Sequence, residues 1–150
     1  MRSSCARMAP VRFRTSITPV LTVRGAADAV AFYQRAFGAE EVYRNTYANG
    51  AIVAELAIGD ARFRVAEEAL AAANLSPQSL HGTTVRINLL VADPDGFAAR
   101  AIASGAIEVA PVADQSYGLR QGRLADPFGH HWLIGRPLEG VTSDWARTGE

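Results

Sequence analysis

Three side chains in this sequence are the best suited to chemistry. His131, in the phrase DPFGHHWLI, acts either as a hydrogen-bond donor or general base, or as a polar residue at a cavity mouth bonded to water or backbone. Arg86 lies on an expected central strand, where a buried guanidinium needs a carboxylate. That carboxylate is either Glu55, in an internal ion pair, or a ligand anion. Tyr117, in a loop, either stacks on a flat ligand or packs on the pocket rim.

Several kinds of chemistry lack the residues they require. The chain has no Lys, which excludes a lysine Schiff base, and no Gly-x-Ser-x-Gly elbow for a nucleophilic serine. No glycine-rich phosphate loop follows a strand, so nucleotide cofactors are not expected. A net charge of +0 argues against nucleic acid or an anionic membrane surface as a partner. The single cysteine, Cys5, and the lack of an apolar run long enough for a signal peptide favour a cytoplasmic protein.

The first half of the chain predicts a strand, a helix and three further strands. The helix is expected over 26–37, because its apolar residues recur at helical spacing and Gly38 follows it. Asn49-Gly50 is a strong hairpin signal between two of the strands. The strands are expected at 16–23, 41–47, 51–58 and 62–66. The aromatic residues assigned to the core are Phe13, Phe32, Tyr33, Phe37, Phe63 and Phe97.

The same order then returns. Asp93-Pro94 starts a helix that runs to Ser104, and strands are expected at 84–91, 107–113, 119–125 and 130–136. Leu21 and Leu89 occupy matching positions 68 residues apart, which indicates a duplication. The expected fold is α+β, with two tandem βαβββ modules forming a curved eight-stranded mixed sheet around a central cleft. The domain spans 16–138, with modules at 16–66 and 83–138, a linker at 67–82, an N-terminal extension at 1–15 and a C-terminal tail at 139–150.

The phrase AVAFYQRAFGAE after the first strand, the phrase DPFGHHWLI and the repeated element order resemble the vicinal oxygen chelate superfamily. This superfamily includes glyoxalases, bleomycin-resistance proteins and extradiol dioxygenases. The resemblance covers about 17–138 and implies a small organic ligand in the cleft between the modules, and a homodimer. Because the members differ in mechanism, the resemblance leaves the activity open.

Enzymes of this superfamily usually hold one divalent metal with side chains from the first and last strand of each module. The resemblance and the 68-residue shift place those positions at Thr18, Val65, Arg86 and Leu133. None of these is a good metal ligand, since a guanidinium repels a cation and Val and Leu offer no lone pair. No cofactor is therefore expected. A displaced divalent-metal site that uses Glu55 and His131 is the alternative.

Strand alternation assigns the remaining candidates to faces. His131 and Leu133 are expected to point into the cavity, with Trp132 toward the helix, and Arg86 shares its parity with Asn88. The arginines on other strands, Arg64, Arg120 and Arg123, are expected to face solvent. The candidate ligand-binding residues are Thr18, Glu55, Arg86, Asn88, Tyr117, His131 and Leu133.

The leading functional hypothesis is a protein that sequesters a drug or metabolite in the cleft without metal, as in the bleomycin-resistance branch. The alternative is a lyase, isomerase or dioxygenase of the same superfamily. Such an enzyme uses a displaced metal, or it uses His131 as a base and Arg86 to steady an enolate or carboxylate.

Overall fold

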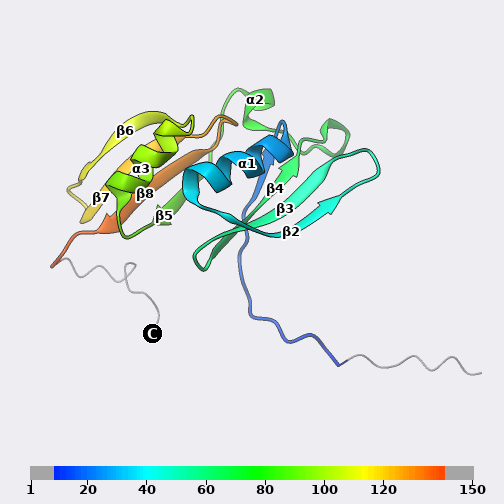
Figure 1. Cartoon of the computed structure of the whole chain (residues 1–150), viewed down its shortest axis with the longest axis horizontal. Helices are drawn as coiled ribbons and strands as arrows, with labels where there is room; N and C mark the ends of the chain where they lie inside the picture. Colours follow the sequence, from blue (N-terminus) through cyan, green and yellow to red (C-terminus); the bar gives the residue numbers. More distant parts are fainter. Residues whose placement is uncertain (1–8, 141–150) are drawn as a thin grey trace, which may run out of the picture.

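The computed structural model describes residues 9–140, which form two βαβββ modules (Figure 1). The first comprises β1 (Val20–Val23), α1 (Ala26–Phe37), β2 (Glu40–Thr46), β3 (Ile52–Ile58) and β4 (Ala61–Glu67). The second comprises β5 (Arg86–Leu90), α3 (Pro94–Ala103), β6 (Ile107–Asp114), β7 (Leu119–Ala125) and β8 (His131–Pro137). Between them lie the short helices η1 (Leu70–Ala72) and α2 (Pro77–Leu80). Cys5 and the outer parts of the expected extension and tail fall outside the described residues.

The α+β fold of two tandem modules is thus confirmed, and its eight strands form two four-stranded mixed sheets. The strand orders are β1-β4-β3-β2 and β5-β8-β7-β6, so both modules have the same topology. In each sheet the first and last strands of the module are parallel neighbours. This places β5 at the edge of its sheet, and the expectation of a central strand for Arg86 is wrong.

The first strand is shorter than its composition predicts. It begins at Val20 rather than Ser16. Pro19 precedes it, and because proline has no backbone N–H, it cannot continue the ladder as a donor. Its carbonyl still accepts a hydrogen bond from Arg64 N at 2.7 Å. Phe13 lies upstream of this point and is 84% exposed, so its assignment to the core is wrong.

Both modules share one hydrophobic core beneath α1 and α3, which contact each other on the same side of the two sheets (Figure 1). Aromatic rings cross the module boundary: the centroids of Phe37 and Trp132 are 4.8 Å apart, and those of Phe63 and Trp132 are 5.3 Å apart. Such pairs add to the free energy gained by burying the rings. Neither module could bury its helix-side face alone to the same extent.

The turn between β7 and β8 is held by a buried carboxylate. Asp126, only 3% exposed, accepts hydrogen bonds from the Tyr33 hydroxyl and from Trp132 Nε1 at 2.9 Å. It also accepts from the backbone N–H groups of Phe128 and His130. Burial and the charge of Asp126 raise the pKa of Tyr33 well above its ordinary value, so the hydroxyl stays protonated and remains a donor. The phrase DPFGHHW therefore ties the second module to α1 of the first.

Within residues 9–140, no helix is both long and apolar enough to cross a membrane.

Candidate functional site

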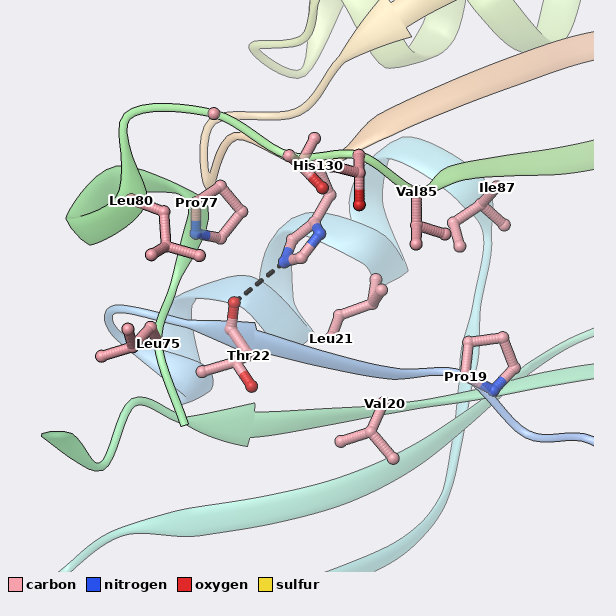
Figure 2. Close-up of a pocket in the computed structure, with 13 residues that line it drawn as sticks. Pro19, Val20, Leu21, Thr22, Leu75, Pro77, Leu80, Val85, Ile87 and His130 are labelled. Atoms are coloured by element: carbon pink, nitrogen blue, oxygen red, sulfur yellow. Dashed lines mark hydrogen bonds between the residues drawn. The ribbon is translucent and has the colours of Figure 1, made fainter. Parts of the chain in front are cut away.

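A cleft of about 710 Å³ lies between the two modules, where the free edge of β1 faces β5 (Figure 2). Large apolar side chains converge on it although they are well exposed: Val20 is 55% exposed, Leu80 58% and Val85 62%. Thr22, Thr84 and His130 supply polar groups at its wall. Cavities of this volume, mostly apolar with a few polar groups, are typical of small-molecule sites.

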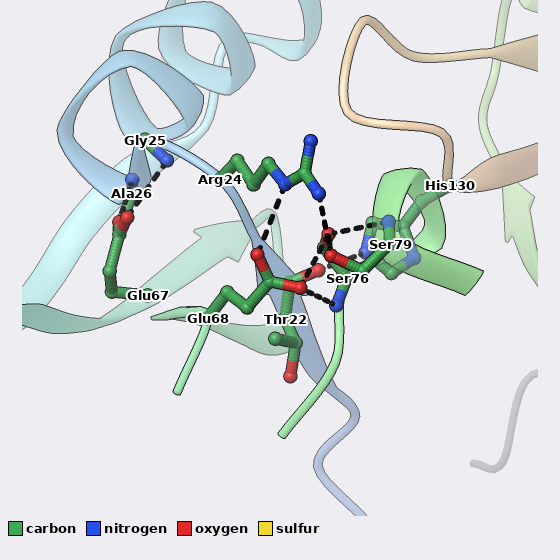
Figure 3. A network of polar contacts seen from close by, with 9 residues as sticks. All are labelled: Thr22, Arg24, Gly25, Ala26, Glu67, Glu68, Ser76, Ser79 and His130. Atoms are coloured by element: carbon green, nitrogen blue, oxygen red, sulfur yellow. Dashed lines mark hydrogen bonds and ion pairs between the residues drawn. The ribbon is translucent and has the colours of Figure 1, made fainter. Parts of the chain in front are cut away.

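The walls of the cleft are fixed by polar contacts from the linker (Figure 3). Glu68 accepts hydrogen bonds from the backbone N and hydroxyl of Ser76 and from Arg24 Nε at 3.1 Å. Hydrogen bonding, chiefly from Ser79 and the Ser76 backbone, lowers the pKa of Glu68 to about 2, so the carboxylate stays ionised. These bonds hold α2 against the end of β1.

Two further contacts fix the position of β1 itself. Glu67 accepts hydrogen bonds from the backbone N–H groups of Gly25 and Ala26, which satisfies the first donors of α1 (Figure 3). His130 Nε2 donates to the Thr22 carbonyl at 2.8 Å and so joins the two modules across the cleft (Figure 2). Both sides of the cleft are therefore held in place before any ligand arrives.

The open face of the second sheet, opposite the helices, carries most of the predicted ligand-binding residues. Arg86 and His131 are Cα partners on β5 and β8, and Asn88 and Leu133 are the next pair on that face. Gln121 Nε2 donates to Asn88 Oδ1 at 3.3 Å, and the Tyr117 hydroxyl donates to Gln121 Oε1 at 2.6 Å. Tyr117 thus reaches this face through Gln121, and the structure brings five of the predicted residues to one sheet.

His131 is held in one tautomer by its neighbour. Arg123 Nε donates to His131 Nδ1 at 2.9 Å, so Nδ1 is an acceptor and the ring proton lies on Nε2. Burial first, and the charge of Arg123 second, lower the pKa of His131 below its ordinary value. With the Nδ1 lone pair engaged and Nε2 protonated, His131 is a hydrogen-bond donor here and has no free lone pair with which to act as a base.

On the open face of the first sheet, two arginines share one carboxylate. Glu55 forms ion pairs with Arg62 Nη1 at 2.9 Å and Arg64 Nε at 3.0 Å, and these bonds lower its pKa. The expected Arg86–Glu55 ion pair is therefore wrong: Glu55 is engaged within its own sheet. Arg86 is exposed and makes no ion pair within residues 9–140.

The four positions of the superfamily's metal site need one correction. Val65 is fully buried and pairs with Leu21 on the helix side, so it does not face the open side of the sheet. Leu133 pairs with Asn88 on β5, and the corresponding pair in the first module is Val20 with Arg64. The first-module equivalent of Leu133 is therefore Arg64, and the predicted register was wrong by one residue.

The corrected set is Thr18, Arg64, Arg86 and Leu133. Two guanidiniums and a leucine do not fit a divalent cation, since arginine stays protonated and repels it. Among the described residues, no three His, Cys, Asp or Glu side chains lie close enough to hold a metal ion. Thr18 is half-buried just before β1, next to the cleft residue Pro19.

Sequence reasoning missed several residues of the cleft and of the open face of the second sheet. Arg123 was expected to face solvent, but it binds His131, and Gln121 links two predicted residues. The alternation of β7 already placed both on one face, which is a signal the sequence contained. Thr22 and the apolar residues of α2 gave no such signal, because only the packing of the linker brings them to the cleft.

The sequence of the chain is similar to a family model and to known proteins. A family model described as a glyoxalase-like domain matches residues 19–134. An uncharacterized protein of Mycobacterium bovis is 36% identical over 138 residues, which cover 89% of this chain and 91% of that protein.

Solved structures agree in fold. A gene product of Arabidopsis thaliana superposes with a TM-score of 0.64 at 26% identity, covering 83% of this chain and 100% of that chain. TioX from Micromonospora sp. ML1 superposes with a TM-score of 0.63 at 27% identity, covering 85% of this chain and 100% of TioX. The fosfomycin resistance protein FosX from Listeria monocytogenes, complexed with Mn(II) and sulfate, gives 0.61 at 19% identity, covering 83% and 93%.

Proposed function

Since the chain belongs to the glyoxalase-like family of the vicinal oxygen chelate superfamily, we propose that it binds a small organic molecule in the inter-module cleft and sequesters it without a metal. The observation that carries this proposal is the cleft of about 710 Å³ into which exposed apolar side chains from β1, α2 and the segment before β5 converge. Isolated exposed apolar residues are ordinary, but a group of them around one concave site indicates a ligand.

The polar groups of the cleft suit orientation of a ligand rather than chemistry on it. Thr22 and Thr84 offer hydroxyls, whereas the His130 ring is already bonded to the Thr22 carbonyl. The superfamily's metal positions carry Thr18, Arg64, Arg86 and Leu133, which favours binding over metal-assisted turnover. A drug or a metabolite is the expected ligand class.

The test uses the neutral apolar dye N-phenyl-1-naphthylamine, which fluoresces when it leaves water. We expect saturable binding to the full chain and a loss of about tenfold or more in affinity for Leu80→Glu, because a carboxylate is costly to desolvate in an apolar cleft. Leu70→Glu is the matched control, since Leu70 is 66% exposed and does not line the cleft. Equal dye binding by both variants would contradict the proposal.

A homodimer is part of the same proposal. Each sheet leaves two edge strands, β1 and β2 in the first and β5 and β6 in the second, and open edges offer a route to association. Sedimentation equilibrium of the full chain should give twice the chain mass of 16.0 kDa. A monomer at micromolar concentration would contradict the proposed homodimer but not the proposed binding of a ligand in the cleft.

A further inference from the structure

The inter-module cleft runs along the edge of a strand. Val20, Leu21 and Thr22 are consecutive residues of β1, and all three line the cleft. Because their side chains alternate between the two faces of the sheet, one cavity contacts all three only if it follows the strand edge. β1 stands at the end of the strand order β1-β4-β3-β2, so this edge is open. The cleft is therefore bordered by backbone as well as by side chains.

The backbone groups of β1 divide between β4 and the cleft. The Pro19 carbonyl accepts a hydrogen bond from Arg64 N at 2.7 Å, so Pro19 faces β4. In a parallel pair, every second residue of a strand bonds to the same neighbour, and Leu21 therefore faces β4 as well. The N–H and C=O groups of Val20 and Thr22 point the other way, toward the cleft.

One of these groups already accepts a donor from the second module. His130 Nε2 donates to the Thr22 carbonyl at 2.8 Å, which shows that this edge can form hydrogen bonds across the cleft (Figure 2). The N–H and C=O of Val20 and the N–H of Thr22 lie along the same edge, and β5 on the other side belongs to a separate sheet. Thr22 is half-buried, and backbone groups that water reaches poorly gain from a partner.

We infer that the cleft binds a short peptidic molecule, which lies along β1 as an added strand. This deepens the proposed function and rests on it, because the peptide occupies the same cavity. Strand addition to an open edge is a general mode of peptide recognition, in which main-chain hydrogen bonds give affinity and side-chain pockets give selectivity. A row of amides matches the two donors and the acceptor of this edge, whereas a purely apolar ligand leaves them unpaired.

The side chains of the cleft define which peptide fits. An added strand alternates its own side chains between the two faces of the sheet. On the helix side it meets Leu21 and Ile87, and Ile87 pairs with the buried Trp132. On the open side it lies beside Val20 and Thr22. We therefore expect apolar, β-branched residues at every second position of the ligand, with small polar residues between them.

The test compares the peptide acetyl-Thr-Val-Thr-Val-amide with a backbone-ester analogue, in which oxygen replaces each N–H between residues and the side chains are unchanged. Both are titrated into the ¹⁵N-labelled full chain, and affinities are measured from the backbone amide signals by NMR. We expect the peptide to bind at least about fivefold more tightly than the ester, because the ester has no N–H to donate to the Val20 carbonyl. The amide signals of Val20 and Thr22 should move downfield when the peptide binds.

Variants assign the binding to the edge of β1. Val20→Pro removes an N–H that faces the cleft and keeps the bonds between β1 and β4, since proline is tolerated on an edge strand. Its affinity for the peptide should be at least about fivefold lower than that of Val20→Ala, which shortens the side chain but keeps the N–H. Val109→Pro is the matched control. Val109 lies at a bulge of the edge strand β6, is 50% exposed and does not line the cleft, so this variant should bind the peptide like the wild type.

Three outcomes would overturn the inference. They are equal affinity for peptide and ester (including no binding of either), binding that leaves the Val20 and Thr22 amide signals in place, and equal affinity of Val20→Pro and Val20→Ala. The first two need no variant, so they decide the matter even if Val20→Pro does not fold.

The dye experiment separates this inference from the proposed function. If dye binding depends on Leu80 but the peptide has no advantage over the ester, only strand addition is refuted. If the peptide advantage maps to Val20 while the dye ignores Leu80→Glu, the apolar cleft is refuted instead.

Discussion

The two modules have the same topology, but they place their carboxylates on opposite sides of the sheet. In the first, Glu55 lies on the open face and forms ion pairs with both Arg62 and Arg64. In the second, the position equivalent to Glu55 is Arg123, and the carboxylate is Asp126, buried on the helix side. The same topology thus carries one face whose arginines share a carboxylate and one face where, within residues 9–140, Arg86 and Arg123 make no ion pair. The charge of a sheet face depends on a few residues, whereas the frame depends on the apolar pattern.

The largest effect should come from removing the buried carboxylate. Asp126→Ala leaves the Tyr33 hydroxyl, Trp132 Nε1–H and two backbone N–H groups without their acceptor. We expect the free energy of unfolding to fall by about 3 kcal/mol or more, because unsatisfied buried donors are costly. Urea denaturation measures this, with Glu55→Ala as the matched control, which should lose no more than about 1 kcal/mol. Similar losses for both variants would mean that the two carboxylates do not differ in role.

The next prediction concerns a charge reversal on the open face of the second sheet. Arg123→Glu puts a carboxylate at the position equivalent to Glu55, beside the His131 ring. The pKa of His131, now lowered by burial and by Arg123, should rise by about one unit or more, because an opposite charge favours the protonated ring. NMR titration of the histidine ring signals measures the shift. An unchanged His131 pKa would show that Arg123 does not control this side chain.

The free energy of unfolding should depend on pH because of His131, on the open face of the second sheet. Because the folded-state pKa of His131 is lowered, the unfolded chain binds more protons between that value and about 6.5. The stabilisation is complete above about 6.5 and is lost as the pH falls through the folded-state pKa. The charges of Arg123, Asp126 and His130 act on the pKa of His131, and Arg86 lies opposite His131 on β5.

Urea midpoints at pH 7.5 and pH 5 measure this dependence. We expect a lower midpoint at pH 5, with a decrease smaller than the loss in Asp126→Ala, and a flatter profile for His131→Gln, whose amide oxygen can still accept from Arg123. Glu55 and Glu68 do not interfere, because their pKa values are lowered and they titrate below this window. A steeper profile in His131→Gln would contradict the assignment.

The smallest effect should come from the open face of the first sheet. Glu55→Gln removes two ion pairs whose arginines are about half exposed, and water screens such pairs. The free energy of unfolding should fall by about 0.5 kcal/mol, and by less in 1 M NaCl. Urea denaturation at both salt concentrations checks this. A loss comparable to that of Asp126→Ala would mean that the Glu55 ion pairs stabilise the fold as strongly as the buried carboxylate does.

Much of the site followed from alternation along single strands. Period-two alternation put His131 and Leu133 on one face and Trp132 on the other, as the structure has them. The metal position in the first module could not be found in this way. Glu55 and its partner Arg64 are nine residues apart, whereas Arg123 and Leu133 are ten apart, so the second hairpin has one extra residue. A slip of one residue exchanges the faces, which is why the constant 68-residue shift points to Val65 instead of Arg64.

The amino-acid sequence by itself determined the duplicated modules, the helix ends at Gly38 and Asp93, and which side chains alternate toward the core, because these depend on local periodicity and backbone preference. Only the tertiary structure decided which strands are edges, that Glu55 is engaged within its own sheet, and that α2 closes a cleft against β1. These features depend on contacts between residues far apart in the chain, whose pairing depends on turn lengths and on packing around one shared core.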